Sequence, residues 1–484
     1  MTSRFSPWIL FTLLTLPLLP SFTFADPLPW GSAPVSTQGT FLMMSDLHFD
    51  PFADPKLVPD LIKHPVEDWE GILNGSKVTT FAPYGNDSNW PLLLSALKQA
   101  QSLGPYDYAI FTGDYLVHKS RDLFVPFGGK DEKAYEDFVT KAEVFVTREV
   151  QKNLPNMPIY FCLGNNDSEC GDYMIASHSD FLERLSTEWG VLLGRPEAVE
   201  SFVDQGNYVV PHPTVPGMEL VVLNDVYWSN RFESDSCHPE SGDPGQDEMN
   251  WLQNQLENAK DKNLKVQLVM HIPPTADVFS TFSKISMGVF LRHPAQLFWD
   301  RKYEKAFVKL LKDYQGVLVS GFAGHTHMDD FRVLNQGPGT TPFFIHICPA
   351  ISPIRGNNPG FQVALYDKGT GAMLDMATYD LTNLETALSA SEAKWALEYD
   401  FDSAYTLSGY NGSALSFLAD EIQTTDAVRQ NFSLYYRGSA PATEKGKYIP
   451  DDAWKILNSL HTQWTENGMN KALDAALAGQ GAGK

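Results

Sequence analysis

Five short polar motifs in the chain contain side chains that could together bind metal ions. Two aspartates, one asparagine and four histidines among them offer the mixed oxygen and nitrogen ligands that suit Zn, Mn or Fe. Any one motif could be an ordinary turn or a surface histidine, but five in this order predict a dinuclear metal site. The motifs are Asp46-Leu47-His48, Gly113-Asp114, Gly164-Asn165-Asn166-Asp167, His271-Ile272-Pro273-Pro274 and Gly324-His325-Thr326-His327.

Each motif comes shortly after an apolar run of strand length. Such runs occupy residues 41–45, 108–112, 159–163, 220–223, 266–270, 317–320, 343–347 and 361–365. Helix-like stretches at 89–102, 132–153 and 246–260 lie between several of them, which predicts an α/β fold with helices packed on sheets. Ligands bind in such folds beyond the carboxyl ends of the strands, where loops gather distant residues. Glycines before Asp114, Asn165 and His325 would allow tight turns there.

The strand-like runs stop after about residue 380. Residues 384–397, 414–423 and 452–468 then have helical patterns. We therefore expect three parts in the chain, which are a signal peptide at residues 1–25, an α/β domain with the motifs at residues 26–380, and a C-terminal helical subdomain at residues 381–484.

The N-terminus has the pattern of a secretory signal peptide. Arg4 is followed by an apolar run at residues 8–19, and Thr23 and Ala25 place small residues before an expected cleavage site. The run is short and interrupted by proline, which disfavours a membrane span of about 20 residues, although an uncleaved anchor stays an alternative. No later stretch has transmembrane character. We therefore expect an exported mature chain without stable membrane insertion, located outside the cell, in the periplasm or in a vacuole- or lysosome-like compartment.

The chain is acidic, with 36 basic and 59 acidic residues and a formal net charge of −23. Nucleic-acid binding requires a basic surface, so we expect no nucleic-acid partner. Four cysteines are too few for a disulfide-built scaffold. Cys162 and Cys348 lie in or beside strand-like runs and should be buried. Cys170 and Cys237 lie in polar stretches and are the expected disulfide, with four free thiols as the alternative.

The order of the five motifs resembles that of the calcineurin-like metallophosphoesterase superfamily. Further details resemble its acid sphingomyelinase-like branch: residues 46–51, the position of His118 after Asp114, the motif at His271, and the long stretch at residues 350–361. The resemblance runs from about residue 41 to residue 366 and continues more weakly beyond. It implies a β-sandwich of two mixed sheets flanked by helices, with the metallophosphoesterase catalytic domain at residues 26–380.

The resemblance also implies a role for each motif residue. The cofactors would be two divalent metal ions, zinc in the first place, with manganese or iron as alternatives. In the family, such a pair of cations activates water for attack on the phosphorus of a small phosphate ester. The first metal would be held by Asp46, His48 and His327 and the second by Asn165, His271 and His325, with Asp114 as the bridging ligand.

The chain departs from the family pattern at Asn166, where most members have a histidine that contacts phosphate and helps to protonate the leaving group. An asparagine can donate a hydrogen bond but cannot deliver a proton. We therefore assign the leaving-group acid to His118, since histidine is the commonest general acid. A surface or helix-start histidine is the alternative. Residues that could orient the metal ligands from outside, or else be ordinary loop residues, are Asp167, Asn224, Asp225 and Asp329.

These inferences predict a phosphodiesterase acting on soluble phosphodiesters or nucleotides. Lipid-cleaving acid sphingomyelinases have a saposin domain before the catalytic domain, and residues 26–40 leave no room for one. An endopolyphosphatase-like polyphosphate hydrolase is the alternative, because the G-N-N-D form of the third motif also occurs in those relatives. They typically lack the final histidine of the last motif, which is His327 here. A non-enzymatic binding protein is the third reading.

Overall fold

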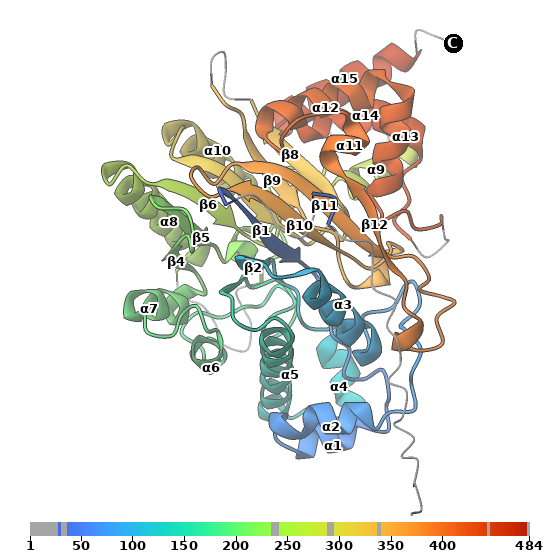
Figure 1. Ribbon diagram of the computed structural model, residues 1–484. Helices are drawn as coiled ribbons and strands as arrows, with labels where there is room; N and C mark the ends of the chain where they lie inside the picture. Colours follow the sequence, from blue (N-terminus) through green and yellow to red (C-terminus); the bar gives the residue numbers. More distant parts are fainter. Residues whose placement is uncertain are drawn as a thin grey trace, which may run out of the picture.

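The structure is a computed structural model that describes residues 28–30, 36–233, 242–287, 295–335, 340–442 and 446–481. Within these residues the strands form two six-stranded sheets (Figure 1). The first sheet has the order β12-β11-β10-β1-β2-β3, with bounds Trp395–Asp400, Met373–Leu381, Gly360–Asp367, Gln38–Met44, Tyr108–Phe111 and Ile159–Phe161. The second has the order β4-β5-β6-β7-β9-β8, with bounds Tyr208–Pro211, Met218–Val222, Lys265–Val269, Leu318–Ala323, Phe343–Ile347 and Asp330–Leu334.

Both sheets are mixed and they pack on each other. β1 runs parallel to β2 and antiparallel to β10, while β5, β6, β7 and β9 run parallel between the antiparallel strands β4 and β8. The ring of Phe41 in β1 lies 5.6 Å from that of Phe322 in β7. The hydroxyl of Tyr208 in β4 donates a hydrogen bond of 2.7 Å to the carbonyl of Phe161 in β3. The expected α/β sandwich is therefore confirmed.

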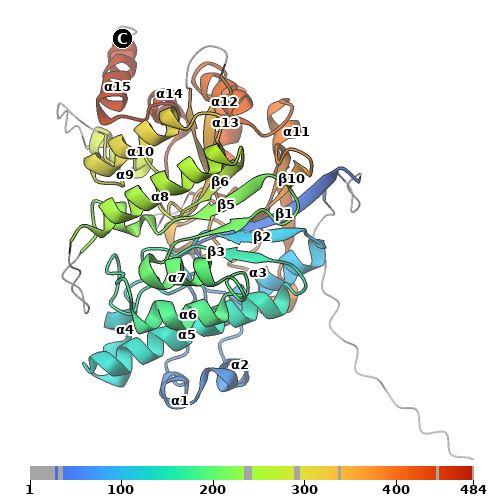
Figure 2. The ribbon, with the colours of Figure 1, turned by 90° about the vertical axis from the view of Figure 1, so that its left-hand side faces the viewer.

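Helices flank the sandwich (Figures 1 and 2). Those beside the first sheet are α1 (Val58–Lys63), α2 (Trp69–Asn74), α3 (Trp90–Leu103), α4 (Ser120–Gly128), α5 (Glu132–Asn153), α6 (Asp180–Glu188) and α7 (Pro196–Gln205). Those beside the second sheet are α8 (Pro244–Asp261), α9 (Val278–Ser286) and α10 (Arg301–Asp313). The C-terminal group contains α11 (Phe401–Tyr405), α12 (Gly412–Thr424), α13 (Asp426–Tyr435), α14 (Trp454–Leu457) and α15 (Glu466–Gly481).

Polar caps explain where the best-predicted helices begin. Asn89, Asp131 and Asp243 precede α3, α5 and α8, and the side chain of each accepts a hydrogen bond from a backbone N–H of the first turn. The apolar periodicity and these caps together fix the helices, which match the stretches predicted from sequence to within two residues.

The sequence pattern fails between residues 384 and 397, which it predicts to be helical. Strand β12 begins there at Trp395 and runs antiparallel to β11. The buried indole of Trp395 donates to the hydroxyl of Ser95 at 3.0 Å, and its ring lies 5.5 Å from that of Phe361. Pairing with a sheet edge and burial of a large ring outweigh a weak local helix preference. The pattern also misses β4, which is only four residues long and ends in proline, and β8 and β11, where polar residues interrupt the apolar runs.

The three-part division of the chain stays a prediction. Residues 1–25 lie outside the described residues. Residue 380 lies within β11, and β12 extends the same sheet beyond it, so the segments before and after residue 380 share one sheet.

Two further expectations concern membranes and thiols. Among the described residues, none of the helices combines the length and apolarity needed to cross a lipid bilayer. Cys162 and Cys348 are free and buried, as their place in the sequence predicts. Cys237 lies outside the described residues, so its pairing with Cys170 stays a prediction.

A buried ionic network joins the C-terminal helices to β8. The carboxylate of Asp330 accepts hydrogen bonds from Arg332 at 2.7 Å and from the ring of His461 at 2.9 Å. All three side chains are buried. Further along β8, the indole of Trp464 donates to the carbonyl of Val333 at 2.8 Å. The C-terminal segment is therefore anchored to the second sheet by directional bonds as well as by apolar packing.

We predict that Asp330→Asn lowers the free energy of unfolding by about 3–5 kcal/mol, because it leaves the buried Arg332 without its counter-ion. Asp313→Asn, which removes an exposed ion pair with Lys309, should cost less than about 1 kcal/mol. Denaturant unfolding of both variants measures the difference. Equal losses would contradict this role of the network.

Candidate active site

All seven predicted metal ligands lie together at one end of the sandwich. Loops after β1, β2 and β3 of the first sheet supply Asp46, His48, Asp114 and Asn165. Loops after β6 and β7 of the second sheet supply His271, His325 and His327. The site is thus built where the carboxyl ends of strands from both sheets meet, as the sequence pattern predicts.

Five of these residues have a left-handed backbone. The φ angle is 48° at Asp46, 40° at His48, 58° at Asp114 and 69° at both His325 and His327. Residues other than glycine seldom adopt this conformation, and they keep it only where their surroundings compensate for the strain. The strain is therefore concentrated at the residues with candidate ligand atoms.

Two glycines let the loops approach one another. A Cβ atom at Gly113 would lie 2.6 Å from the backbone nitrogen of Gly164. A Cβ atom at Gly164 would lie 2.2 Å from Oδ1 of Asp114. Any side chain at either position would push the second and third motifs apart, so the glycines are part of the site.

The first group of ligand atoms comes from Asp46, His48 and His327. The two Nε2 atoms of the histidines are 3.2 Å apart, and Oδ1 of Asp46 lies 3.4 Å from Nε2 of His327. Nδ1 of His48 lies 2.8 Å from the carbonyl of Leu116, to which it can only donate. The neutral ring of His48 therefore presents the lone pair of Nε2 to the group.

The second group comes from Asn165, His271 and His325. Nε2 of His271 lies 3.1 Å from Oδ1 of Asn165 and 3.3 Å from Nδ1 of His325. Nδ1 of His271 donates to the carbonyl of Thr112 at 2.7 Å, which again leaves Nε2 as an acceptor. The amide nitrogen of Asn165 donates to Asp172 at 2.7 Å, which turns its oxygen toward His271.

Asp114 lies between the two groups. Its Oδ2 atom is 3.4 Å from Nε2 of His48 and 3.3 Å from Nε2 of His271. Its Oδ1 atom accepts the backbone N–H of Asn166 at 2.8 Å, and the amide of Asn166 donates to Oδ2 at 2.9 Å. This is the position that a bridging ligand needs.

The donor atoms fit a pair of cations. Oδ2 of Asp46 accepts hydrogen bonds from Ser45 and from the backbone of His325, whereas Oδ1 is buried without a partner in the described part of the chain. The lone pairs of His48, His271 and Asp114 converge on the same space. Buried acceptors facing one another repel unless a cation lies between them, and carboxylate, amide and imidazole donors suit a divalent transition metal.

The imidazole pKa values show how strongly this space attracts positive charge. Burial opposes charge on His48 and His271, but the Asp114 carboxylate overrides it and raises their pKa values to about 9 and about 10. Burial, and next a neighbouring histidine, hold the pKa values of His325 and His327 well below the usual value. Protons and metal ions therefore compete for His48 and His271, and metal binding releases protons.

Two of the four predicted supporting residues hold the ligand loops. Asp167 accepts hydrogen bonds from the backbone N–H groups of Asp114 and Tyr115, both at 2.7 Å, and of Gly164 at 2.8 Å. Asp225 accepts from the backbone of His271 at 3.1 Å. Both carboxylates position backbone rather than imidazole nitrogens, which are held by carbonyls.

The other two supporting residues act elsewhere. The amide of Asn224 donates to the carbonyl of Gln205 at 2.9 Å. Asp329 accepts from Gln362 and from the hydroxyl of Tyr399, at 2.9 and 2.7 Å. These bonds lie in the framework around the site, which favours the alternative that Asn224 and Asp329 do not orient the candidate metal ligands.

His118 lies beside the metal ligands and is held by a residue that the sequence did not single out. Its ring stacks on that of His48 with the centroids 4.0 Å apart. Its Nδ1 atom is 3.0 Å from Oδ1 of Asp87, which also accepts the backbone N–H of His118 through Oδ2 at 2.9 Å. With Nδ1–H donated to Asp87, Nε2 is the atom of His118 that faces the pocket.

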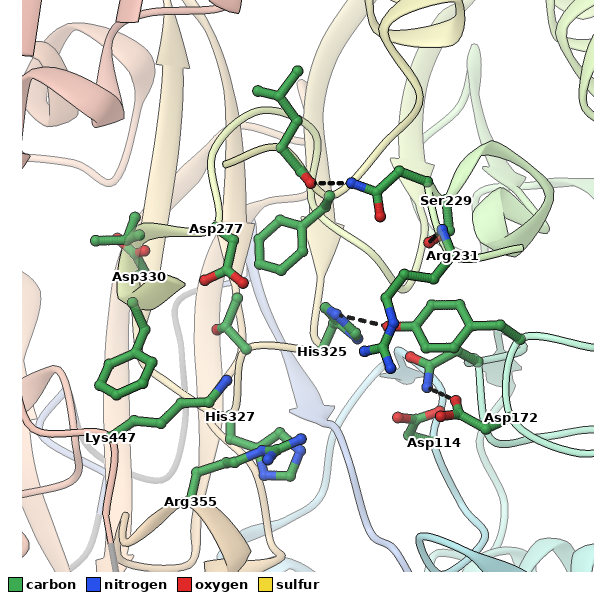
Figure 3. A pocket seen from close by; sticks show the side chains of 18 of the residues that line it. Asp114, Asp172, Ser229, Arg231, Asp277, His325, His327, Asp330, Arg355 and Lys447 are labelled. Atoms are coloured by element: carbon green, nitrogen blue, oxygen red, sulfur yellow. Dashed lines mark hydrogen bonds between the residues drawn. The ribbon is translucent and has the colours of Figure 1, made fainter. Parts of the chain in front are cut away.

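Four basic side chains line the pocket around the ligand groups, and Figure 3 labels three of them, Arg231, Arg355 and Lys447. The fourth, Arg332, pairs with Asp330, and the carboxylates of Asp172 and Asp277 also line the pocket. Arg355 lies next to His118, with one guanidinium nitrogen 3.4 Å from Nε2. Asp87 and these cations come from segments without a metal-binding motif. Only Arg355, in the stretch at residues 350–361, had any signal in the sequence.

The family follows from a comparison with known sequences. The sequence model described as calcineurin-like phosphoesterase matches residues 39–329, which is more than half of the chain. The chain belongs to this family. The model described as acid sphingomyelin phosphodiesterase C-terminal region matches residues 341–443. The resemblance of the motifs is thereby confirmed, and the protein is a metal-dependent phosphoric ester hydrolase of the phosphodiesterase type.

Relatives of the chain share about a quarter of its residues. Acid sphingomyelinase-like phosphodiesterase 3b of Homo sapiens is 25% identical over 426 residues, which cover 84% of each chain. Cyclic GMP-AMP phosphodiesterase SMPDL3A of Rattus norvegicus is 26% identical over 431 residues, covering 85% of this chain and 88% of its own. Among solved structures, a dimetal phosphatase from Danio rerio covers 70% of this chain and 95% of its own, with 13% identity and a TM-score of 0.37.

We predict that Asp114→Asn lowers the metal content of the purified protein and abolishes turnover, because a neutral amide bridges two cations poorly. Elemental analysis together with hydrolysis of bis-p-nitrophenyl phosphate measures both effects. Asp122→Asn, an exposed position on α4, is the matched control and should keep metal and activity. Full activity of Asp114→Asn with two bound metals would contradict the ligand assignment.

His118→Gln should slow hydrolysis of esters with alkoxide leaving groups by about 10²–10⁴-fold, the usual effect of losing a general acid. It should slow release of p-nitrophenolate far less, because this group departs without a proton. Asp87→Asn should show the same dependence on the leaving group to a smaller degree, since it acts through the orientation of His118. An equal loss for both leaving groups would show that His118 has another role.

Proposed function

We propose that the protein is an exported phosphodiesterase that uses two divalent metal ions to hydrolyse soluble phosphodiesters or nucleotides. The observation that carries the proposal is the position of Asp114, whose Oδ2 atom lies 3.4 and 3.3 Å from the Nε2 atoms of His48 and His271. One carboxylate oxygen thus serves two convergent groups of ligands, which is the arrangement required for hydrolysis assisted by two metals.

The ligand roles follow from the two groups. Asp46, His48 and His327 would hold one ion, Asn165, His271 and His325 the other, and Asp114 both. Zinc is the expected metal, with manganese or iron as alternatives, since imidazole dominates the donor set. When bound, the pair of ions supplies Lewis-acid activation of water and neutralises charge on the phosphoryl oxygens.

The chain's own residues would handle orientation and proton transfer. Asp87 accepts from Nδ1 of His118 and favours the charged form of its ring, in which Nε2 also carries a proton that it could deliver to the leaving oxygen. The amide of Asn166 donates to Asp114, which holds the bridging carboxylate in place. A histidine at residue 166 could supply a second proton, and the asparagine leaves this task to His118.

Export is proposed from the N-terminal pattern of Arg4, the apolar run and the small residues before residue 26. The compartment would be extracellular, periplasmic or vacuole- or lysosome-like. The candidate disulfide between Cys170 and Cys237 belongs to the same proposal, because disulfides persist in oxidising compartments.

A soluble substrate fits the walls of the pocket better than a bilayer lipid does. Arg231, Arg355 and Lys447 place three positive charges around the ligand groups, and charged walls solvate acyl chains poorly. The named activities of the relatives include a cyclic GMP-AMP phosphodiesterase, which acts on a soluble nucleotide. The alternative of a polyphosphate hydrolase is supported by the G-N-N-D motif and by the same three cations.

We predict that kcat/KM on bis-p-nitrophenyl phosphate or on nucleotides exceeds kcat/KM on sphingomyelin vesicles assayed without detergent. Lipid would have to leave the bilayer with a cost of about 0.8 kcal/mol per exposed CH₂ group. Loss of an activity in Asp114→Asn, but not in the control Asp122→Asn, shows that this activity arises at the candidate site. Faster hydrolysis of vesicular sphingomyelin by the unmodified protein would refute the proposed substrate class.

A further inference from the structure

Two of the basic side chains of the pocket, Arg355 and Lys447, have no acidic partner among the described residues, whereas Arg332 pairs with Asp330 at 2.7 Å. Some cations elsewhere pair with carboxylates, as Arg148 does with Glu67 and Glu188 at 2.7 and 2.9 Å. Within the part of the chain that the structure describes, Arg355 and Lys447 have no carboxylate within ion-pair distance. Arg355 and Lys447 differ from unpaired cations at the surface in that both line the pocket beside the candidate metal ligands.

The chain holds Arg355 and Lys447 next to each other. The backbone N–H of Lys447 donates to the carbonyl of Arg355 at 2.8 Å. The ammonium group of Lys447 lies over the ring of Phe279, 5.5 Å from its centroid. Nε of Arg355 is buried and has no hydrogen-bond partner among the described residues. Both cations therefore keep donors free for a ligand.

The pairing of like charges is unfavourable without an anion. Burial, and next the guanidinium of Arg355, lower the pKa of Lys447 to about 8. An anion between the two groups would remove this repulsion and accept several charge-assisted hydrogen bonds. The buried Nε of Arg355, which has no hydrogen-bond partner among the described residues, is the observation that points to a ligand.

The two cations lie on one side of the metal ligands. Figure 3 shows Arg355 and Lys447 beside His327, whereas Arg231 lies near His325 and Asp172. The first pair is therefore on the side of His118, where the proposed mechanism places the leaving group. A group held by Arg355 and Lys447 would belong to the part of the substrate that departs.

We infer that Arg355 and Lys447 form a second anion-binding subsite, which takes a phosphate group adjoining the scissile one. This inference rests on the proposed function and narrows its substrate class to phosphoanhydrides. Hydrolysis consumes one water. A bond forms from the water oxygen to the scissile phosphorus, which lies beside Asp114, and the bond from this phosphorus to the oxygen that bridges the two phosphates breaks. The departing phosphate keeps the bridging oxygen and remains on Arg355 and Lys447 until it is released.

Two classes of compound contain a phosphate group next to the scissile one. They are nucleoside di- or triphosphates and inorganic polyphosphate. Phe279 and Phe298 are partly exposed rings on the wall of the pocket, and an aromatic ring is a platform on which a base can stack. ATP and tripolyphosphate carry the same chain of phosphates, so their comparison separates the two sources.

The test uses the purified, metal-loaded full chain with ATP, tripolyphosphate and bis-p-nitrophenyl phosphate, which has a single phosphoryl group. Lys447→Met should reduce the ratio of kcat/KM for ATP or tripolyphosphate to that for bis-p-nitrophenyl phosphate by at least about tenfold, mainly through KM. The inhibition constant of tripolyphosphate against bis-p-nitrophenyl phosphate should rise by a similar factor. Lys447→Arg should keep both the ratio of kcat/KM values and the inhibition constant close to those of the unmodified protein, because it keeps the charge.

Two further variants make the test specific. Arg355→Gln should have the same effect as Lys447→Met and guards against a folding defect in either variant. Lys309→Met removes an exposed lysine on α10 and should change neither ratio.

The outcomes separate the inference from the proposed function. Equal losses on all three substrates would overturn the inference, since the cations would then act on the scissile phosphate. The inference would also be overturned if the unmodified enzyme cleaves bis-p-nitrophenyl phosphate, does not cleave ATP or tripolyphosphate, and is not inhibited by them. Failure to cleave any of the three would refute the proposed function itself. A preference for ATP or for tripolyphosphate supports the subsite and names its source.

Discussion

The buried carboxylate of Asp114 is the constraint on which the site depends. Its side chain is 2% exposed and lies against two imidazole nitrogens that face it with lone pairs when the rings are neutral. Such an arrangement is stable only with positive charge in its centre, supplied by protons or by metal ions. The surroundings hold these groups together against repulsion through close-packed glycines, a buried Asp167 and carbonyls that fix the tautomers of His48 and His271.

The grouping of the candidate ligands could be predicted from sequence because each motif is local. A strand, a glycine and a polar residue at a fixed spacing carry their own structural information, and the sheet then brings the strand ends together. Asp87 could not be found in this way. It lies three residues before the first residue of α3 in an ordinary turn sequence, and only the tertiary fold places it on His118.

The same reasoning explains why the C-terminal part was predicted less well. Helix α12 has apolar periodicity of its own, whereas β12 owes its conformation to the edge of β11 and to burial of Trp395 against α3. Lys447 lies in a segment without regular structure, and its position depends on one backbone hydrogen bond to Arg355. Contacts of this kind have no pattern in the local sequence, so neither the strand nor the pocket lysine was predictable.

The net negative charge of the chain and the cations of the pocket act on an anion over different distances. At physiological ionic strength charges are screened over about 8 Å, so the net charge weakly repels anions at a distance while the pocket cations act within contact range. The guanidinium of Arg355 also lies where a leaving oxygen would approach Nε2 of His118. A departing phosphate is already an anion that needs no proton and is stabilised by Arg355, whereas an alkoxide requires the proton of His118. One wall of the pocket can therefore assist both kinds of leaving group, the first by charge and the second by proton transfer.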